Sequence, residues 1–220
     1  MKDFKVIEVK RSIFEDNNAD ADRLREQLKS EGTFLLNLMS SPGAGKTTTL
    51  KRTINMLKDE INIGVMEADI DSDVDAQAIT DTGVRAIQIH TGGMCHMDAA
   101  MTQQGLNEMG IDDVDLIFIE NVGNLVCPAE FDTGAGINIT ILSVPEGDDK
   151  PAKYPLVYTV SDVVLINKVD ALAIFDFDKE LVEKRIHTLN PKAQIFYISA
   201  KKDEGFESWI NYLKEKMKEW

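Results

Sequence analysis

The stretch "LMSSPGAGKTTTL" (38–50) has the form of a phosphate-binding loop between a strand and a helix. It meets the pattern G-x-x-x-x-G-K-[ST] at Gly45, Lys46 and Thr47, while Ser40 stands in place of the first glycine. Glycines in such a loop let successive backbone N–H groups face an anion, and the next helix adds the positive end of its dipole. The sequence therefore predicts a triphosphate site. The expected contacts come from Ser41, Gly43, Ala44, Gly45, Lys46, Thr47 and Thr48.

The rest of the chain repeats the strand-and-helix alternation that this loop begins. Short apolar runs alternate with longer amphipathic runs, which is typical of parallel βαβ units. The apolar runs are almost continuously hydrophobic, as expected for strands covered by helices on both faces. The pattern predicts an α/β protein with a three-layer α/β/α P-loop fold and a mostly parallel sheet of about seven strands. The expected strands are 33–40, 61–68, 85–91, 115–121, 137–144, 162–168 and 194–200. Helices are expected to begin at Lys46 and near Asp73, Met97, Ala152, Asp178 and Gly205.

The 220 residues are expected to form a lead-in segment over 1–32, with a helix over Phe14–Ser30, and a P-loop domain over 33–220. A formal charge of −14 argues against nucleic acid as a partner, because phosphate backbones bind basic patches. No apolar run reaches the ~18 residues that cross a bilayer, so no membrane partner is expected, and none resembles a secretory signal. Two cysteines in this composition predict a cytoplasmic protein with reduced thiols.

The motif "LINKVD" (165–170) follows a later apolar run and indicates guanine as the base. A carboxylate at Asp170 can accept hydrogen bonds from N1–H and from the 2-amino group of guanine. Adenine offers neither, and a site whose buried polar group is left unpaired rejects an analogue by large factors. Lys168 is expected along the base plane and Asn167 against the phosphate loop. The loop "SAKK" (199–202) is expected to contribute Ser199, Ala200 and Lys201, with a backbone N–H toward the guanine O6.

Acidic residues at the ends of two predicted strands are candidates for Mg²⁺. "IFIENVG" (117–123) supplies Glu120, followed three residues later by a glycine whose amide can contact the γ-phosphate. "MEADIDSDVDAQAI" (66–79) offers Asp69 and Asp75 for Mg²⁺ or the attacking water, while Asp71 and Asp73 are expected to be solvated. The sequence shows no obvious arginine that could stabilise the transition state of GTP hydrolysis from the same chain, so slow hydrolysis is expected. The expected magnesium ligands are Thr47, Asp69, Asp75 and Glu120. The expected catalytic residues are Lys46, Asp75 and Glu120, and Lys46 is expected to contact the β- and γ-phosphates.

The only two cysteines of the chain lie in glycine-containing loops, each after a predicted strand. Cys95 and His96 are adjacent in "TGGMCHMDAA" (91–100), and Cys127 follows later in "ENVGNLVCPAEFD" (120–132). Free cysteines are usually small buried hydrophobic residues. Here the carboxyl ends of parallel strands bring their loops to one edge of the sheet, where ligands bind. Their place favours metal binding, with Zn²⁺ and Ni²⁺ both suited to thiolate and imidazole ligands. His90 is expected to be a strand-end residue and not a fourth ligand.

Together, five segments closely resemble the hydrogenase nickel-incorporation GTPases of the HypB family, in the SIMIBI class of P-loop proteins. The resemblance runs from Phe34 to the C-terminus. It implies binding of GTP and Mg²⁺, slow hydrolysis and a nucleotide-dependent homodimer. It also implies that Cys95, His96 and Cys127 bind Zn²⁺ or Ni²⁺. Metal would pass to a [NiFe]-hydrogenase large-subunit precursor, with a second accessory protein as partner. The segments are "SSPGAGKTT" (40–48), "TGGMCHMDAAM" (91–101), "ENVGNLVCPAEFD" (120–132), "SVPEGDDKPAKYP" (143–155) and "NKVD" (167–170).

Some features depart from that family or leave alternatives open. The chain has no histidine-rich tract and only three histidines, so nickel storage is not expected. Lys150 and Lys153 could reach a nucleotide or an acidic face across a dimer, or lie in a solvated loop. Two other functions remain open: a GTPase chaperone for another metalloenzyme or a cobalamin enzyme, and a nucleotide-gated dimeric scaffold.

Overall fold

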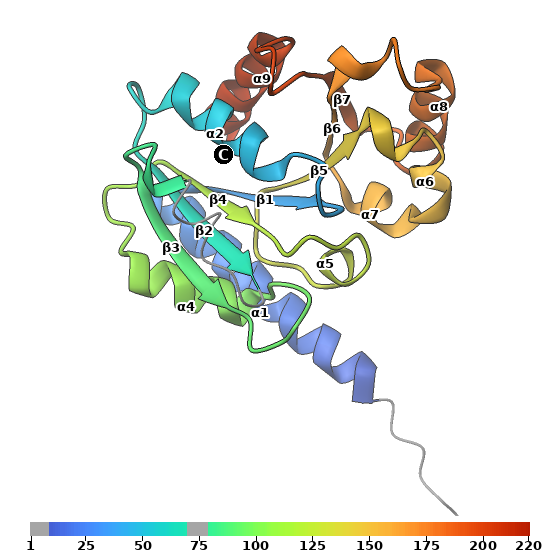
Figure 1. The fold of residues 1–220 in the computed structure, drawn as a ribbon. Coiled ribbons are helices and arrows are strands. Elements are labelled where there is room, and N and C mark those ends of the chain that lie inside the picture. Colours follow the sequence, from blue (N-terminus) through green and yellow to red (C-terminus); the bar gives the residue numbers. More distant parts are fainter. Residues whose placement is uncertain (1–8, 70–78) are drawn as a thin grey trace, which may run out of the picture.

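The computed structural model describes residues 9–69 and 79–220. A seven-stranded sheet forms the middle layer, in the order β3-β2-β4-β1-β5-β6-β7, and every pairing is parallel (Figure 1). This confirms the predicted fold class and all seven predicted strands. The strands are β1 (Phe34–Ser40), β2 (Ile63–Asp69), β3 (Arg85–His90), β4 (Leu116–Glu120), β5 (Ile137–Ser143), β6 (Val163–Asn167) and β7 (Gln194–Tyr197).

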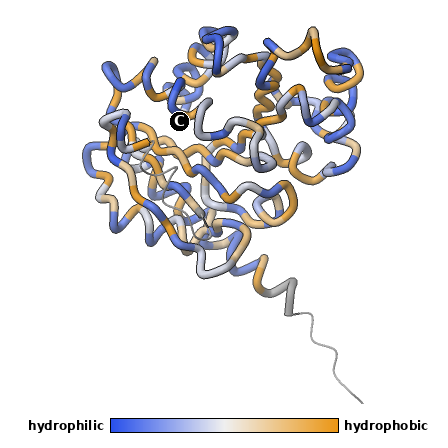
Figure 2. The backbone as a smooth tube through the Cα atoms, in the orientation of Figure 1, coloured by the Kyte–Doolittle hydropathy of each residue, from blue (hydrophilic) through white to orange (hydrophobic). Residues whose placement is uncertain are grey.

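Helices cover both faces of the sheet, as Figure 1 shows. The helices α2 (Lys46–Leu57) and α9 (Phe206–Glu219) pack on one face, and α1 (Val9–Glu31), α4 (Ala99–Met109), α7 (Pro155–Val160) and α8 (Lys179–Leu189) pack on the other. Side chains alternate between faces along each strand. In β1, Leu36 packs in the α2 cluster, whereas Leu35 packs with α1. Figure 2 shows the hydrophobic residues gathered along these central strands.

The helices that follow a clear N-cap residue begin at or near the residues predicted from the sequence. α2 begins at Lys46 as predicted. α4 begins at Ala99, because Asp98 is its N-cap and accepts a hydrogen bond from the Met101 N–H at 2.8 Å. α8 follows the N-cap Asp178, and α9 follows Gly205. The helix predicted near Asp73 lies outside the described residues.

The helix predicted near Ala152 is two short helices instead of one. α6 (Lys150–Lys153) ends before Tyr154, and α7 begins at Pro155. A proline disfavours helical backbone in the residue before it but fits the first turn of a new helix. Tyr154 accordingly has φ −128° and ψ 62°. A further short helix that was not predicted, α5 (Cys127–Glu130), has Pro128 in its first turn.

The lead-in helix α1 is longer than predicted and lies against the loops at the carboxyl edge of the sheet. Asn17 donates to the Asp132 carbonyl at 2.9 Å and accepts from the Ala99 N–H at 3.0 Å. Arg25 forms an ion pair with Asp132 at 2.8 Å. The boundary between a lead-in segment and a P-loop domain at residue 33 stays a prediction. Among the described residues, no helix is both long and apolar enough to cross a membrane.

The sheet order places β1 at the point where the chain reverses direction across the sheet. β1 lies between β4 and β5, and the chain moves toward β3 before it returns to β4 and continues toward β7. Ligands of open α/β sheets bind outside the carboxyl ends of the strands at such a switch point. The loop after β1 is the phosphate loop predicted from the sequence.

Candidate nucleotide and metal site

The phosphate loop joins β1 to α2 and lines a cavity of about 650 Å³. Gly43 and Gly45 have φ angles of 78° and 95°, a left-handed backbone that glycine adopts without steric cost. Gly45 is the N-cap of α2, so the N–H groups of the first helical turn face this cavity. Ser40, which replaces the first glycine of the motif, is the last residue of β1 and has no positive φ. A serine therefore causes no backbone strain at that position.

We expect Gly45→Ala to destabilise the protein more than Gly43→Ala. Both substitutions force a β-carbon into left-handed backbone, which costs about 1–2 kcal/mol. A β-carbon at Gly45 would also lie 2.5 Å from Asn167 Nδ2, whereas one at Gly43 meets nothing within 4 Å. Urea unfolding of the nucleotide-free variants should show an additional loss of about 1 kcal/mol or more for Gly45→Ala, as expected for a disrupted hydrogen bond. Equal losses would mean that Asn167 moves aside without cost.

The predicted base-binding residues lie together beside the phosphate loop. Asn167, at the end of β6, donates from Nδ2 to the Ala44 carbonyl at 2.9 Å. Its Oδ1 accepts from the Lys168 N–H at 2.7 Å and from the Ala200 N–H at 3.2 Å. Lys168 has left-handed backbone and donates from Nζ to the Gly43 carbonyl at 2.6 Å. Asn167 thus connects the phosphate loop to the loop that follows β7.

Asp170 has its carboxylate held by a neighbouring hydroxyl. Ser199 is buried and donates from Oγ to Asp170 Oδ1 at 2.6 Å. This hydrogen bond lowers the pKa of Asp170 below the usual value, so the group is ionised at neutral pH. An ionised carboxylate is acceptor-only, which suits a base that presents two donors. Lys201, the other predicted residue of this loop, is exposed.

Glu120 ends β4 and faces the phosphate loop from the neighbouring strand. Its side chain is only 2% exposed. Its Oε1 accepts a hydrogen bond from Thr47 Oγ1 at 2.6 Å and lies 3.6 Å from Lys46 Nζ. Hydroxyl and carboxylate oxygens are the ligand type that Mg²⁺ takes in proteins. Thr47 and Glu120 therefore fit a magnesium ion, with the Lys46 ammonium beside them for phosphate oxygens.

A second buried carboxylate, Glu67, lies beside Glu120. β2 and β4 pair with Glu67 opposite Glu120, and Glu67 is 3% exposed and lines the same cavity. Sequence reasoning missed this residue because it considered only the aspartates that follow the strand. Strand alternation could have found it, since Glu67 shares its face with Val65, which packs in the α2 cluster.

The aspartates predicted at the magnesium site are only partly described. Asp69 is the last residue of β2, opposite His90 of β3. The side chain of Asp69 lies outside the described part of the structure, as do Asp71, Asp73 and Asp75. Their roles stay predictions.

The two lysines considered for contacts across a dimer differ in position. Lys150, at the start of α6, has Nζ 3.4 Å from Ser41 Oγ and 3.5 Å from Glu146 Oε1. It therefore lies at the phosphate loop of its own chain. Lys153 is exposed and pairs with Asp149 at 2.6 Å.

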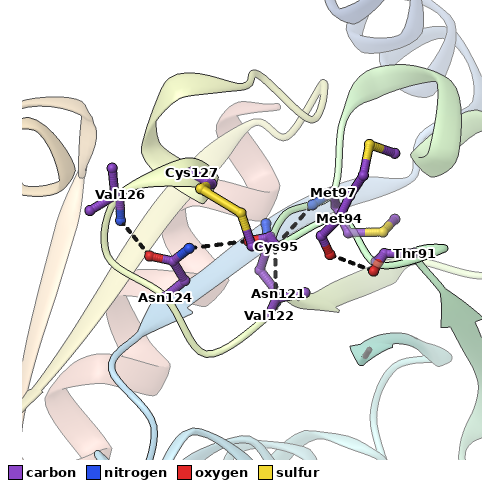
Figure 3. Close-up of a disulfide and its surroundings, with 9 residues drawn as sticks. All are labelled: Thr91, Met94, Cys95, Met97, Asn121, Val122, Asn124, Val126 and Cys127. Carbon is purple, nitrogen blue, oxygen red and sulfur yellow. Dashed lines mark hydrogen bonds between the residues drawn. A yellow bond between two sulfur atoms is a disulfide. The ribbon is translucent and has the colours of Figure 1, made fainter. Parts of the chain in front are cut away.

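The loops that follow β3 and β4 bring the two cysteines together. Cys95 and Cys127 form a disulfide with their Cα atoms 6.1 Å apart (Figure 3). The expectation of two reduced thiols is thus corrected. Both loops leave the same edge of the sheet, and this Cα separation lies within the range that a disulfide spans. Their separation of 32 residues along the chain gave no sign of the pairing.

His96 completes a group of three potential metal ligands. The donor atoms of Cys95, His96 and Cys127 all lie within 4.8 Å of one another. With the disulfide reduced, two thiols and one imidazole would form a donor set that suits Zn²⁺ or Ni²⁺. His90, at the exposed end of β3, lies outside this group.

The surroundings of His96 also fit a metal ligand. Its ring is 8% exposed and stacks on Phe131, with ring centroids 3.8 Å apart. Burial lowers the pKa of His96 below its ordinary value, so the imidazole is neutral at neutral pH, which is the form that binds metals. Its Nδ1 is buried and makes no hydrogen bond to any described residue. Sequence reasoning did not identify Phe131 as the residue that orients this ring.

Comparisons with known proteins agree with this fold. Residues 34–197 match the family described as CobW/HypB/UreG, nucleotide-binding domain. The hydrogenase maturation factor HypB of Escherichia coli (strain K12) is 42% identical over 213 residues, which cover 97% of this chain and 73% of that protein. The hydrogenase/urease maturation factor HypB of Helicobacter pylori (strain J99) is 39% identical over 222 residues, covering 99% of this chain and 90% of that protein.

Solved structures give the same result. HypB from Archaeoglobus fulgidus superposes with a TM-score of 0.85 at 38% identity, covering 92% of this chain and 98% of that one. HypB from Helicobacter pylori in complex with nickel has a TM-score of 0.85 at 40% identity, and the match covers 93% of this chain and 96% of that one. The fold and the loop define a P-loop nucleotide-binding domain. The chain belongs to the CobW/HypB/UreG family, and within it to the HypB proteins.

Proposed function

We propose that this protein is a GTP-hydrolysing metallochaperone that binds nickel or zinc and takes part in nickel insertion into [NiFe]-hydrogenase precursors. The observation that carries this proposal is one short segment, 120–127. It begins at Glu120, which binds Thr47 of the phosphate loop, has Val122 and Gly123 in the cavity lining, and ends at Cys127 in the group of metal ligands. Loops at this place in P-loop proteins rearrange with the γ-phosphate. A metal ligand carried by such a loop would change position when the nucleotide changes.

The nucleotide side of the proposal assigns roles to residues around the cavity. Asp170 would pair with guanine, Thr47 and Glu120 would hold Mg²⁺ with Asp69 and Asp75, and Lys46 would contact the β- and γ-phosphates. Among the described residues, no arginine lines the cavity, which supports slow hydrolysis without assistance. Bound Mg²⁺ would neutralise charge on the phosphate oxygens.

The metal side is supported by the relatives and by the surface around the ligands. The relatives at about 40% identity are named hydrogenase maturation factors, and one solved relative holds nickel. Met94 and Val126, next to the two cysteines, are 41% and 48% exposed. Exposed apolar side chains at this place fit an interface, which we assign to a nucleotide-dependent homodimer and to the recipient proteins. These would be a second accessory protein and the hydrogenase large-subunit precursor. Thiols kept reduced for this role imply a compartment such as the cytoplasm.

The test is a titration of Ni²⁺ and Zn²⁺ into the reduced protein, with GDP and with a non-hydrolysable GTP analogue. We expect Cys95→Ala and Cys127→Ala each to lower metal affinity by about a hundredfold or more. Loss of a residue that only orients a metal ligand already costs up to about a hundredfold, and loss of the ligand itself should cost at least as much. The wild-type affinity should differ between the two nucleotides. Met94→Leu, next to Cys95 but outside the donor group, is the control and should bind like wild type. If both cysteine variants bind metal like wild type in both states, the protein is a GTPase with another cargo.

Two other functions are separated by simple measurements. A GTPase chaperone for another metalloenzyme or a cobalamin enzyme would hydrolyse GTP without metal at the cysteines. A nucleotide-gated scaffold would bind GTP with negligible hydrolysis in a single-turnover experiment. The measured rate under single-turnover conditions therefore distinguishes the scaffold from both enzymes.

A further inference from the structure

Three asparagines, two of them buried, form a chain of side-chain hydrogen bonds across the middle of the sheet. Asn138 of β5 accepts from Asn37 of β1 at 3.0 Å, and Asn37 accepts from Asn121 at 2.9 Å. Asn37 is 1% exposed and Asn121 is fully buried. Buried polar groups are costly unless they are hydrogen-bonded, so this chain holds Asn121 in one orientation.

Asn121 also binds the loop that carries Cys95 and His96. Its Oδ1 accepts from the Met97 N–H at 3.1 Å and from the Val122 N–H at 2.9 Å (Figure 3). Met97 is fully buried and follows His96 directly. The other side-chain contact from this segment, Asn124 Nδ2 to the Cys95 carbonyl, is longer at 3.5 Å.

Asn121 and Glu120 project to opposite faces of the sheet. The Asn121 N–H bonds to the Leu38 carbonyl, so the strand direction of β4 continues through this residue. Successive side chains along a strand alternate between faces. Glu120 accordingly contacts Thr47 under α2, while Asn121 contacts Asn37 and Met97 on the face that α1 and α4 cover. One peptide unit thus connects the phosphate cavity to the metal loop.

The segment after Asn121 lies directly against the phosphate loop. A β-carbon at Gly123 would lie 3.2 Å from Pro42 Cγ. A rearrangement of the phosphate loop or of the γ-phosphate therefore reaches this backbone by contact. Because Asn121 bonds to Met97, a shift of 120–123 displaces the backbone next to His96 relative to Cys127.

We propose that Asn121 is the positioning residue through which nucleotide state sets metal affinity at Cys95, His96 and Cys127. This inference rests on the proposed function and specifies its regulation. Asn121 belongs neither to the group of metal ligands nor to the residues that line the phosphate cavity. Its substitution should therefore leave both sites able to bind while it weakens the dependence of one on the other.

The measurement is the ratio of the Ni²⁺ dissociation constants with GDP and with a non-hydrolysable GTP analogue. In the wild type, coupling of ordinary size gives a ratio of about 5 to 150. We expect Asn121→Ala to lower the logarithm of this ratio by about half or more, while the backbone connection from Glu120 to Cys127 retains the rest. The affinity in the GDP state should stay within about threefold of wild type, since all three donors remain. By linkage, the ratio of nucleotide affinities with and without Ni²⁺ must change equally.

Asn37→Val is the matched control. It removes the hydrogen bond that Asn121 Nδ2 donates, but Asn121 Oδ1 keeps its bonds from the Met97 and Val122 N–H groups, which still hold the side chain in place. The ratio should therefore stay within about twofold of wild type, a smaller change than typical coupling. A wild-type ratio in Asn121→Ala would overturn this inference alone. Equal nickel affinity of the wild type in both nucleotide states would overturn the proposed function as well. The wild-type measurement alone therefore tests the proposed function, and the Asn121→Ala measurement tests the role of Asn121.

Amide hydrogen exchange in the wild type tests the same inference even if Asn121→Ala does not fold. The Met97 N–H should exchange at rates that differ by about tenfold or more between the two nucleotide states, because its acceptor moves with the segment. The Thr102 N–H, which bonds to the Asp98 carbonyl inside α4, is the internal reference. Equal exchange of the Met97 N–H in both states would overturn the proposed role of Asn121.

Discussion

Asp170→Asn is expected to lower the affinity for GTP by about a hundredfold or more and to favour XTP in its place. The carboxylate can accept from both N1–H and the 2-amino group of guanine, while an amide has only one acceptor oxygen and adds two donors. One amide hydrogen would then face the guanine amine, so that in the complex two donors would meet without an acceptor. Xanthine has a carbonyl in place of that amine, so the same amide donor finds an acceptor.

The surroundings of Asp170 make this substitution informative. Ser199 Oγ holds one carboxylate oxygen at 2.6 Å, and Asn167 joins the same loop to the Ala44 carbonyl. Asparagine has nearly the same shape as aspartate, so these contacts are retained and only the donor pattern changes. The expected change is therefore in base preference and not in the fold.

Equilibrium binding of GTP, XTP and ATP analogues measures this prediction. Asp176→Asn is the matched control, because Asp176 is an exposed aspartate in the same stretch of loop. It should bind GTP like wild type. Unchanged GTP affinity in Asp170→Asn would mean that the base is recognised elsewhere. A loss of GTP without a gain of XTP would point to a displaced loop.

The fold could be predicted nearly in full because its signals are local. Near-continuous apolar runs such as 163–167 indicate strands covered on both faces, and the glycine pattern of 43–45 marks the start of α2. The errors also have local causes. Pro155 divides one predicted helix into two, and the turn at Ser199 ends β7 early, where the Ser199 N–H bonds to the Glu204 carbonyl at 3.0 Å.

The site was predicted less completely because part of it depends on the order of strands. Glu67 lies beside Glu120 only because β2 and β4 are neighbours, and strand order is not visible in local sequence. The chain of Asn138, Asn37 and Asn121 likewise needs three specific strands side by side. Motif residues such as Asn167 and Lys168 could be identified because their chemistry follows from their own spacing.

Lys46→Met is expected to slow GTP hydrolysis at saturating nucleotide by about a thousandfold, the loss that follows removal of one preorganised charge-stabilising group. Lys46 is 14% exposed and lies 3.6 Å from the buried Glu120 carboxylate, with Glu67 on the next strand. Two buried carboxylates beside a bound triphosphate would require cations, and charge is spread over the γ-phosphate oxygens in the transition state. Methionine has a similar length but no charge.

Single-turnover hydrolysis with Mg²⁺ measures this rate, and Lys192→Met is the matched control. Lys192 is exposed and precedes β7, at the edge of the sheet opposite the phosphate loop, so its removal should leave the rate unchanged. A decrease of less than tenfold in Lys46→Met would mean that another cation, such as Lys150 beside Ser41, stabilises the transferring phosphate. Because Lys46 lies outside the group of metal ligands, Lys46→Met should also keep nickel affinity without nucleotide. A variant that binds nickel normally but hydrolyses GTP about a thousandfold more slowly would show that the two sites are chemically separate.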